Sequence, residues 1–302
     1  MYSRSSLAWA GIFFGQGIHW VDGGRPMAQH AGAQDFRCIL CDEIMPRIFI
    51  TGSSDGLGRM AGELLISQGH SVVLHARKEQ RAQQTQRSVP KAEAVVIGDL
   101  TSIAQTREVA AQVNVLGEFD AVIHNAAVGY REPRRLLTED GLSHVFAVNT
   151  LAPYILTALI RTPKRLIYLS SGLHQNGDPS LEDLTWERRA WHGQQAYSDT
   201  KLHDVLLAFA IARRWPDVLS NALEPGWVAT KMGGPSAPDD LKAGYETQAW
   251  LAVSNDKAAK VTGQYFYHQK LRNPNPAARD VEHQEKLLDA CRQVSGVELP
   301  EN

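Results

Sequence analysis

This 302-residue chain has few of the features of disulfide-rich, membrane-spanning or nucleic-acid-binding proteins. Its three cysteines, Cys38, Cys41 and Cys291, cannot form a disulfide framework and favour a reducing compartment. No run approaches the roughly 18 consecutive apolar residues of a membrane span. A formal net charge of −2 argues against a basic nucleic-acid surface. We therefore expect a cytoplasmic protein with neither a membrane span nor a nucleic-acid partner.

The first 44 residues lack a helix or strand period. Cys38-Ile-Leu-Cys41 has the spacing of a redox or half-zinc motif, but no second pair completes it, so we expect no metal. The short apolar patch at 7–14 suggests a signal peptide, yet no clear small-residue cleavage site follows. We interpret 1–44 as a poorly ordered extension, or as a segment upstream of a true start at Met45.

From residue 45 onward, short apolar runs alternate with amphipathic segments. We expect strands at 47–50, 71–75, 93–97, 119–124, 165–169, 218–223 and 264–267. We expect helices at 57–69, 78–86, 102–116, 138–160, 196–214, 239–252 and 280–294. This alternation predicts right-handed βαβ units. The expected fold is therefore a single α/β domain over 45–302, a doubly wound seven-stranded parallel sheet with helices on both faces.

Thr51-Gly-Ser-Ser-Asp-Gly-Leu-Gly58 joins the first expected strand to the first helix. Gly52 suits a tight turn, Gly56 lets the backbone approach a pyrophosphate, and Gly58 lets the helix lie close on the sheet. The positive end of the helix would face the phosphates. A purely structural turn is the alternative, but the position between strand and helix favours a dinucleotide site.

Tyr197 and Lys201 begin the helix expected at 196–214. Their i,i+4 spacing puts phenol and ammonium on one face, where the cation favours the phenolate. Such a pair suits reversible proton transfer to a carbonyl oxygen. An ordinary helix surface is the alternative. The helix follows a strand and its Ser170-Ser171 turn, and ligands of open α/β sheets bind at the carboxyl ends of the strands.

Taken together, these motifs resemble the short-chain dehydrogenase/reductase family in its compact branch, which has a Rossmann fold. The resemblance covers about 46–296. The matching segments, in chain order, are Thr51 to Gly58, Asp99, Asn125-Ala126, Asn149, Ser171, Tyr197 with Lys201, and Pro225 to Thr230. The resemblance implies an oxidoreductase that acts on CH–OH donors with NAD(P).

By this resemblance, Tyr197 is the catalytic acid and base, and Lys201 lowers its pKa and holds the nicotinamide ribose. Ser171 orients or polarises the substrate oxygen, and Asn149 supports a water relay through Lys201. Two alternatives remain open: Asn149 as a hydrogen-bonded helix residue without a catalytic role, and Ser170 as the reactive serine in place of Ser171.

The resemblance also implies a set of cofactor-binding residues. They are Gly52, Ser54, Asp55, Gly56, Leu57, Gly58, Arg77, Asp99, Leu100, Asn125, Ala126, Tyr197, Lys201, Pro225, Val228 and Thr230. Ala76 stands where an acid would bind the ribose 2′-hydroxyl, and Arg77 follows it, which favours NADP(H) over NAD(H). Asp55 opposes this preference, since its carboxylate would weaken phosphate binding.

Two residues depart from the family pattern. His124 and Ala127 replace the usual asparagine and glycine of the Asn-Asn-Ala-Gly turn. Ala127 carries a Cβ, so its loop must avoid the left-handed conformation there or accept strain.

Tyr197 follows Ser171 by 26 positions, more than the family's commonest spacing. Similar insertions occur in the retinol dehydrogenase-like and protochlorophyllide reductase-like branches, and the tail from Thr262 to Pro276 resembles the former. Trp186, Trp191 and His192 in this insertion, with Tyr130 and 232–235, either wall an apolar pocket or pin the insertion to the body. We expect a small apolar alcohol, aldehyde or ketone as substrate, and a homodimer or homotetramer.

A protein of another class remains as an alternative. The same fold could serve as a catalytically silent dinucleotide sensor or scaffold. Loss of Tyr197 or Lys201 would have favoured that reading, and both are present.

Overall fold

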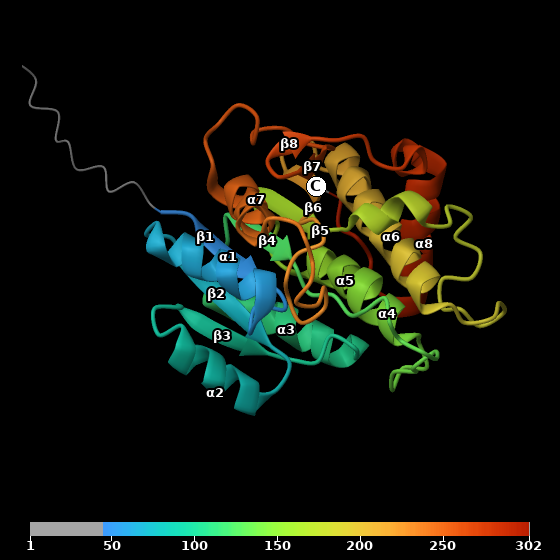
Figure 1. Cartoon of the computed structure of the whole chain (residues 1–302), viewed down its shortest axis with the longest axis horizontal. Coiled ribbons are helices and arrows are strands. Elements are labelled where there is room, and N and C mark those ends of the chain that lie inside the picture. Colours follow the sequence, from blue (N-terminus) through green and yellow to red (C-terminus); the bar gives the residue numbers. More distant parts are fainter. Residues whose placement is uncertain (1–44, 302) are drawn as a thin grey trace, which may run out of the picture. The chain divides into compact units, whose positions relative to one another are not determined.

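One eight-stranded sheet organises residues 45–301, the part of the chain that the computed structural model describes (Figure 1). Its strand order is β3-β2-β1-β4-β5-β6-β7-β8, and β1 to β7 pair in parallel. The strands are β1 Arg47–Ile50, β2 Ser71–Ala76, β3 Ala94–Ile97, β4 Ala121–His124, β5 Arg165–Leu169, β6 Leu219–Glu224, β7 Tyr265–Tyr267 and β8 Lys270–Leu271. The order reverses between β1 and β4, which is where such sheets bind ligands.

Helices connect the strands. They are α1 Gly56–Ser67, α2 Glu79–Ser88, α3 Ile103–Leu116, α4 His144–Phe146, α5 Ala152–Leu159, α6 Gly193–Arg214, α7 Leu241–Val253 and α8 Val281–Ser295. Shorter turns are the π-helix Ala147–Leu151 and the 3-10 helices Gly172–Asn176 and Pro276–Arg279. None of the helices in 45–301 is long and apolar enough to cross a membrane.

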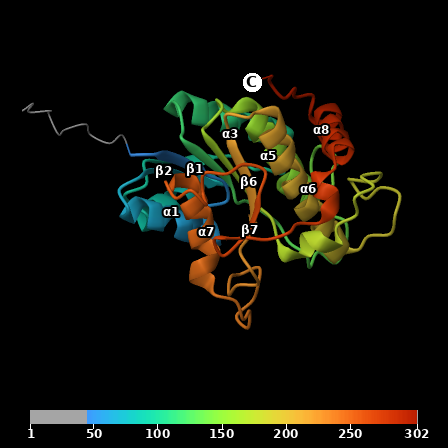
Figure 2. The same ribbon diagram turned by 90° about the horizontal axis from the view of Figure 1, so that it is seen from above.

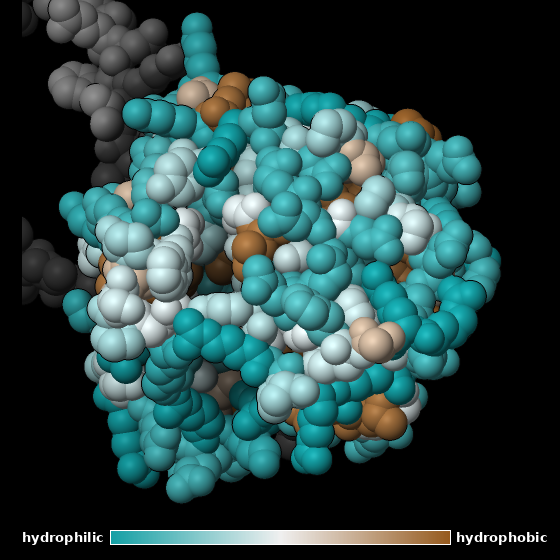
Figure 3. Space-filling view, turned by 45° about the vertical axis from the view of Figure 1, so that its right-hand side comes forward, coloured by the Kyte–Doolittle hydropathy of each residue, from teal (hydrophilic) through white to brown (hydrophobic). Residues whose placement is uncertain are grey.

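The sheet is buried on both faces, because alternate strand residues enter two separate cores. Phe49 belongs to the core that contains side chains of α3, α5, α6 and α8, whereas Ile48 and Ile50 belong to the core that contains side chains of α1 and α7. Figure 2 shows α1 and α7 on one side of the sheet and α3, α5 and α6 on the other. The face in Figure 3 is mostly hydrophilic, with apolar residues scattered over it.

The predicted doubly wound fold is confirmed, and each of the seven predicted strands is present within two residues of its expected ends. The sheet has one further strand. His268 and Gln269 both have positive φ angles, of 47° and 62°, and this turn brings Lys270–Leu271 back antiparallel to β7. The predictions on 1–44, including the Cys38–Cys41 spacing, lie outside the described residues.

The prediction of a helix at 138–160 was wrong for residues 138–143. Gly141 has a φ of 76°, and its N–H donates to the Thr138 carbonyl in a turn. The Ser143 hydroxyl then accepts a hydrogen bond from the Phe146 N–H and caps α4. A helix therefore begins only at His144.

Candidate active site

A cleft of about 390 Å³ opens at the carboxyl ends of the central strands. The predicted cofactor residues that line it are Gly52, Ser54, Asp55, Gly56, Leu57, Arg77, Asp99, Leu100, Asn125, Ala126, Tyr197, Lys201, Pro225 and Thr230. Two predicted cofactor residues lie elsewhere. Gly58 packs behind the loop against the Asn125 amide, and Val228 lines a neighbouring cavity.

The glycine loop is held by contacts that only glycine permits. Gly52 has a φ of 60°, and a Cβ there would lie 2.7 Å from the Ala126 Cα. Its N–H donates to Nδ1 of buried His75 at 3.0 Å, so Nε2 carries the proton that His75 donates to the Gly98 carbonyl at 2.9 Å. Burial lowers the pKa of His75, which keeps the ring neutral in this role. The sequence analysis did not assign His75 to the site.

The helix that follows this loop leaves its first N–H groups available. Asp55 is the N-cap of α1, and its side chain makes no capping hydrogen bond within the described residues. Such N–H groups, at the positive end of a helix, suit a phosphate group. The loop and the helix end therefore fit the pyrophosphate of a dinucleotide.

The carboxylate of Asp55 lies between two cations. Its Oδ2 is 2.6 Å from Arg81 Nη2 and 2.6 Å from Lys231 Nζ. Partial burial opposes ionisation, but the bonds with Lys231 and Arg81 lower the pKa of Asp55 below its ordinary value. Asp55 was expected to weaken phosphate binding, but its charge is compensated by Arg81 and Lys231, two cations that the sequence analysis did not identify.

A basin of about 420 Å³ adjoins the cleft at this point. The charged residues that line it are Asp55, Arg77, Lys78, Arg81 and Lys231. Arg77 Nε lies 3.9 Å from Asp99 Oδ2, and 61% of the Arg77 side chain is exposed. Four cations facing one acid make a suitable environment for a phosphate group.

Tyr197 and Lys201 lie on the buried face of α6, as their spacing predicted. Lys201 Nζ is 5.6 Å from the centre of the Tyr197 ring. It donates to the Leu169 carbonyl at 2.8 Å and to Asp204 Oδ2 at 2.7 Å. The ammonium is therefore fixed between the end of β5 and its own helix.

The net effect on Tyr197 differs from the expected lowered pKa. Burial raises the pKa of Tyr197 above its ordinary value, Lys201 opposes the rise, and Asp204 adds to it. Burial lowers the pKa of Lys201, but the combined effects of Asp204 and Tyr197 leave it above its ordinary value. Lys201 lowers the pKa of Tyr197 as expected, but this effect is smaller than the rise caused by burial and Asp204.

The two serines after β5 have different roles in the structure. The Ser170 hydroxyl is buried and donates to the Lys201 carbonyl at 2.7 Å. Both serines line the cavity next to Tyr197, but only the Ser170 hydroxyl is tied to α6, while the Ser171 carbonyl accepts a hydrogen bond from His174 Nδ1 at 2.7 Å. This arrangement favours Ser171 over Ser170 as the serine that faces a substrate.

Asn149 lies in the π-helix between α4 and α5. Its Oδ1 accepts from the Val128 N–H at 2.8 Å, and its Nδ2 donates to the Val128 carbonyl at 3.0 Å and to Thr200 Oγ1 at 3.1 Å. The amide thus fastens the loop after β4 to α6. These contacts support the alternative of a hydrogen-bonded structural residue, and the water relay stays a prediction.

The structure accommodates both departures from the family pattern. His124 Nε2 lies 3.0 Å from Thr157 Oγ1, which is also 2.7 Å from the Tyr168 hydroxyl. Burial lowers the pKa of His124 to about 3, so the ring is neutral. Ala127 is not among the residues with positive φ, so its loop avoids the left-handed conformation.

A second cavity of about 1000 Å³ meets the cleft at Tyr197. Its larger apolar and aromatic lining residues are Tyr130, Leu173, Trp227, Val228, Met232 and Tyr267. Elsewhere on its wall, Arg272 pairs with buried Glu224 at 2.5 Å and lies over the Tyr267 ring. The cavity therefore offers an apolar interior with a charged pair on one side.

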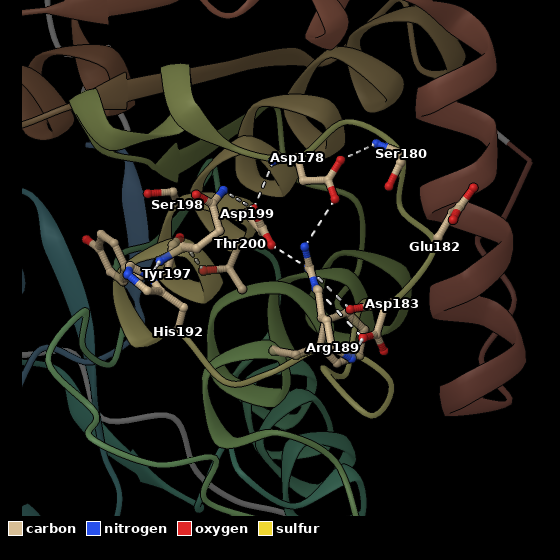
Figure 4. Close-up of polar contacts among 12 residues, drawn as sticks. Asp178, Ser180, Glu182, Asp183, Arg189, His192, Tyr197, Ser198, Asp199 and Thr200 are labelled. Carbon is tan, nitrogen blue, oxygen red and sulfur yellow. Dashed lines mark hydrogen bonds and ion pairs between the residues drawn. The ribbon is translucent and has the colours of Figure 1, made fainter.

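The insertion before α6 is fastened by Arg189, as Figure 4 shows. Its guanidinium lies 2.6 Å from Asp199, 3.1 Å from Asp178 and 3.7 Å from Asp183. It also covers the Trp186 ring, 3.8 Å from its centre. Trp186, Trp191 and His192 line neither cavity. These three residues therefore pin the insertion and do not wall a pocket. The pocket prediction is correct for Tyr130, Met232 and Gly233, which line the second cavity.

Replacing Arg189 with Met should lower stability by about 2 kcal/mol, because Asp199 would keep its burial and lose its cation. A chain of this size should then melt about 4–8 °C lower. Differential scanning calorimetry measures this shift. Arg188→Met is the matched control, since exposed Arg188 forms no ion pair in the described residues. Equal losses in both variants would contradict a special role for Arg189.

Sequence comparisons identify the family of this chain. The family model for short chain dehydrogenase matches residues 46–166. An uncharacterized oxidoreductase of Emericella nidulans is 48% identical over 260 residues, covering 85% of this chain and 99% of the relative. The short-chain dehydrogenase chry4 of Gibberella zeae is 42% identical, with the same two shares covered. The chain belongs to the short-chain dehydrogenase family.

A more distant relative agrees with the expected branch, and two solved structures share the fold. Human retinol dehydrogenase 13 is 30% identical over 84% of this chain and 85% of its own length. A crystal structure of an uncharacterized protein from Mycobacterium paratuberculosis superposes with a TM-score of 0.72 at 23% identity, covering 84% of this chain and 95% of that one. A blue fluorescent protein in complex with NADPH gives 0.57 at 21% identity, covering 73% and 95%. The two structures show that the fold is shared.

Proposed function

We propose that this short-chain dehydrogenase interconverts an alcohol and a carbonyl compound with NADP(H). The observation that carries the proposal is the position of Tyr197. Its buried phenol stands where the cofactor cleft and the second cavity meet, with Lys201 on the cleft side and Ser171 on the cavity side. A proton donor at such a junction can act on a substrate oxygen while a cofactor lies beside it.

When bound, the nicotinamide cofactor supplies or accepts the hydride. Tyr197 gives a proton to the carbonyl oxygen during reduction and takes it back during oxidation. Ser171 donates a hydrogen bond to the same oxygen and polarises the C=O bond. Lys201 has one N–H left after its bonds to Leu169 and Asp204, and this donor suits a ribose hydroxyl.

The preference for NADP(H) rests on the charges of the basin beside the cleft. Arg77 and Lys78 follow β2, and Arg81 and Lys231 compensate the charge of Asp55. A ribose 2′-phosphate would meet a net positive environment there, whereas NAD(H) would leave it unused. The blue fluorescent protein, which has the same fold, was solved in complex with NADPH.

The proposed substrate is a carbonyl compound with an apolar or aromatic body. The cavity of about 1000 Å³ is at the upper end of ordinary ligand pockets and presents tyrosine, tryptophan and methionine side chains. No described feature favours a silent sensor or scaffold, because the residues for proton transfer are assembled.

The proposal is tested by incubating the purified chain with NADPH and a panel of apolar aldehydes and ketones. We expect NADPH consumption, with aromatic and alicyclic ketones turned over faster than short aliphatic ones. NADH should be the poorer cofactor. NADPH binding without turnover of any compound would instead support the sensor or scaffold.

A further inference from the structure

Lys201 has a buried counter-ion that the proposed reaction does not use. Asp204 Oδ2 lies 2.7 Å from Lys201 Nζ, and the side chains of Lys201 and Asp204 are 2% and 3% exposed. Tyr197, Lys201 and Asp204 lie at positions i, i+4 and i+7 of α6, so all three share its buried face. The ammonium therefore stands between a phenol and a carboxylate.

Among residues 45–301, no other charged side chain forms an ion pair with Lys201 or Asp204. Tyr168 on β5 and Tyr265 on β7 face Asp204, and burial raises the pKa of both phenols, which keeps them neutral. The imidazoles of His124 and His203, each with a pKa lowered to about 3, are neutral as well. Beyond these lie Tyr130, whose ring is 5.6 Å from that of Tyr197, and the Glu224–Arg272 pair, already neutralised within itself.

We propose that Asp204 is a positioning residue that holds the Lys201 ammonium and keeps Tyr197 protonated, ready to donate its proton to a carbonyl oxygen at neutral pH. The inference rests on the proposed function, since it assigns Tyr197 the role of proton donor. With Asp204 ionised, the cation already has a negative partner. A phenolate at Tyr197 would put a second anion beside one cation in a buried site, which is unfavourable.

The arrangement suits reduction at neutral pH. In that direction the phenol must begin protonated, and it loses its proton only as the substrate oxygen gains negative charge. In the direction of alcohol oxidation the phenol must first be ionised, so this reaction needs a more alkaline solution. Asp204 changes these pH ranges and leaves the equilibrium constant of the overall reaction unchanged.

Asp204→Asn removes the negative charge and keeps nearly the same side-chain shape. The amide oxygen can still accept a bond from Lys201, but the negative charge is gone. Both protons of the Lys201–Tyr197 pair are then easier to lose, because the cation is less stabilised and the phenolate is no longer repelled. The first apparent pKa of this pair should therefore fall by about one unit or more.

Two readouts test this prediction. The first needs no turnover: tyrosine labelled with ¹³C at Cζ is titrated by NMR in the full chain, with Tyr197→Phe to assign the resonance. The second is the pH profile of kcat/KM for alcohol oxidation with NADP⁺, whose acid limb should move to lower pH by the same amount. If no substrate is turned over, the proposed function fails, and the NMR titration still decides the coupling.

Asp199→Asn is the matched control. Asp199 is a buried carboxylate on the same helix, but it pairs with Arg189, away from Tyr197 (Figure 4). Asp199→Asn should leave the first apparent pKa of the Lys201–Tyr197 pair unchanged. Asp204→Glu keeps the charge, so this pKa should stay close to its wild-type value. An unchanged titration in Asp204→Asn, or an equal shift in Asp199→Asn, would overturn the proposal.

The wild-type chain provides a further test if Asp204→Asn does not fold. Burial raises the pKa of Asp204 to about 6, although Lys201 opposes the rise. As the solution is acidified through this range, Asp204 should lose its charge and the Lys201 ammonium ¹⁵N resonance should shift with it. An ammonium resonance that does not follow Asp204 would refute the pairing.

Discussion

Replacing Tyr197 with Phe should lower turnover at least about 10²-fold while NADPH still binds. The substitution removes one hydroxyl from a ring that is 6% exposed and leaves the packing of that ring in place. Without the phenol, the developing charge on the substrate oxygen has no positioned proton donor. Stopped-flow or steady-state kinetics on the best substrate, with NADPH binding followed by fluorescence, measures both properties.

Tyr130→Phe is the matched control for this experiment. Tyr130 lines the same cavity, and its hydroxyl donates to the Met232 carbonyl at 3.2 Å, so it loses an equivalent atom nearby. We expect its turnover to stay within a few-fold of wild type, because it is not placed to transfer a proton. Full activity in Tyr197→Phe would remove Tyr197 from the mechanism. Loss of NADPH binding would instead assign the residue to cofactor binding.

The sequence predicted the parts of the site that depend on local spacing. The glycine loop, the Tyr197–Lys201 pair and the turn after β5 each follow from a short run of residues placed between a strand and a helix. Parallel strands bring their carboxyl ends to one edge of the sheet, so the motifs meet once the strand order is known. That is why the cleft contains most of the predicted residues.

Contacts between distant segments could not be predicted in this way. Lys231 reaches Asp55 across 176 positions of the chain, and Arg81 reaches it from the next helix. The net pKa of Tyr197 likewise depends on how deeply α6 is buried, which spacing does not show. Asp204 is an exception. Its i,i+3 spacing from Lys201 was visible in the sequence and could have marked it as a partner.

Replacing Arg77 with Ala should weaken NADPH binding about 10- to 150-fold and leave NADH binding nearly unchanged. A charge-assisted bond to a phosphate contributes about 1.5–3 kcal/mol, and only NADPH carries the 2′-phosphate. The Arg77 side chain is 61% exposed and separated from Asp99 by 3.9 Å, so it has room to turn towards a phosphate. Isothermal titration calorimetry at constant ionic strength, with each cofactor, gives the two ratios.

Two further substitutions make the result specific to the basin beside the cleft. Arg81→Ala should also disfavour NADPH, because it removes a cation and leaves Asp55 with Lys231 alone. Arg59→Ala is the control. Arg59 lies on α1 and pairs with Glu63 outside this basin, so both affinities should stay as in wild type. Equal losses of NADPH and NADH in Arg77→Ala would show that Arg77 does not recognise the 2′-phosphate. The cofactor preference would then have to come from Arg81 and Lys231, the two cations that only the folded chain brings to Asp55.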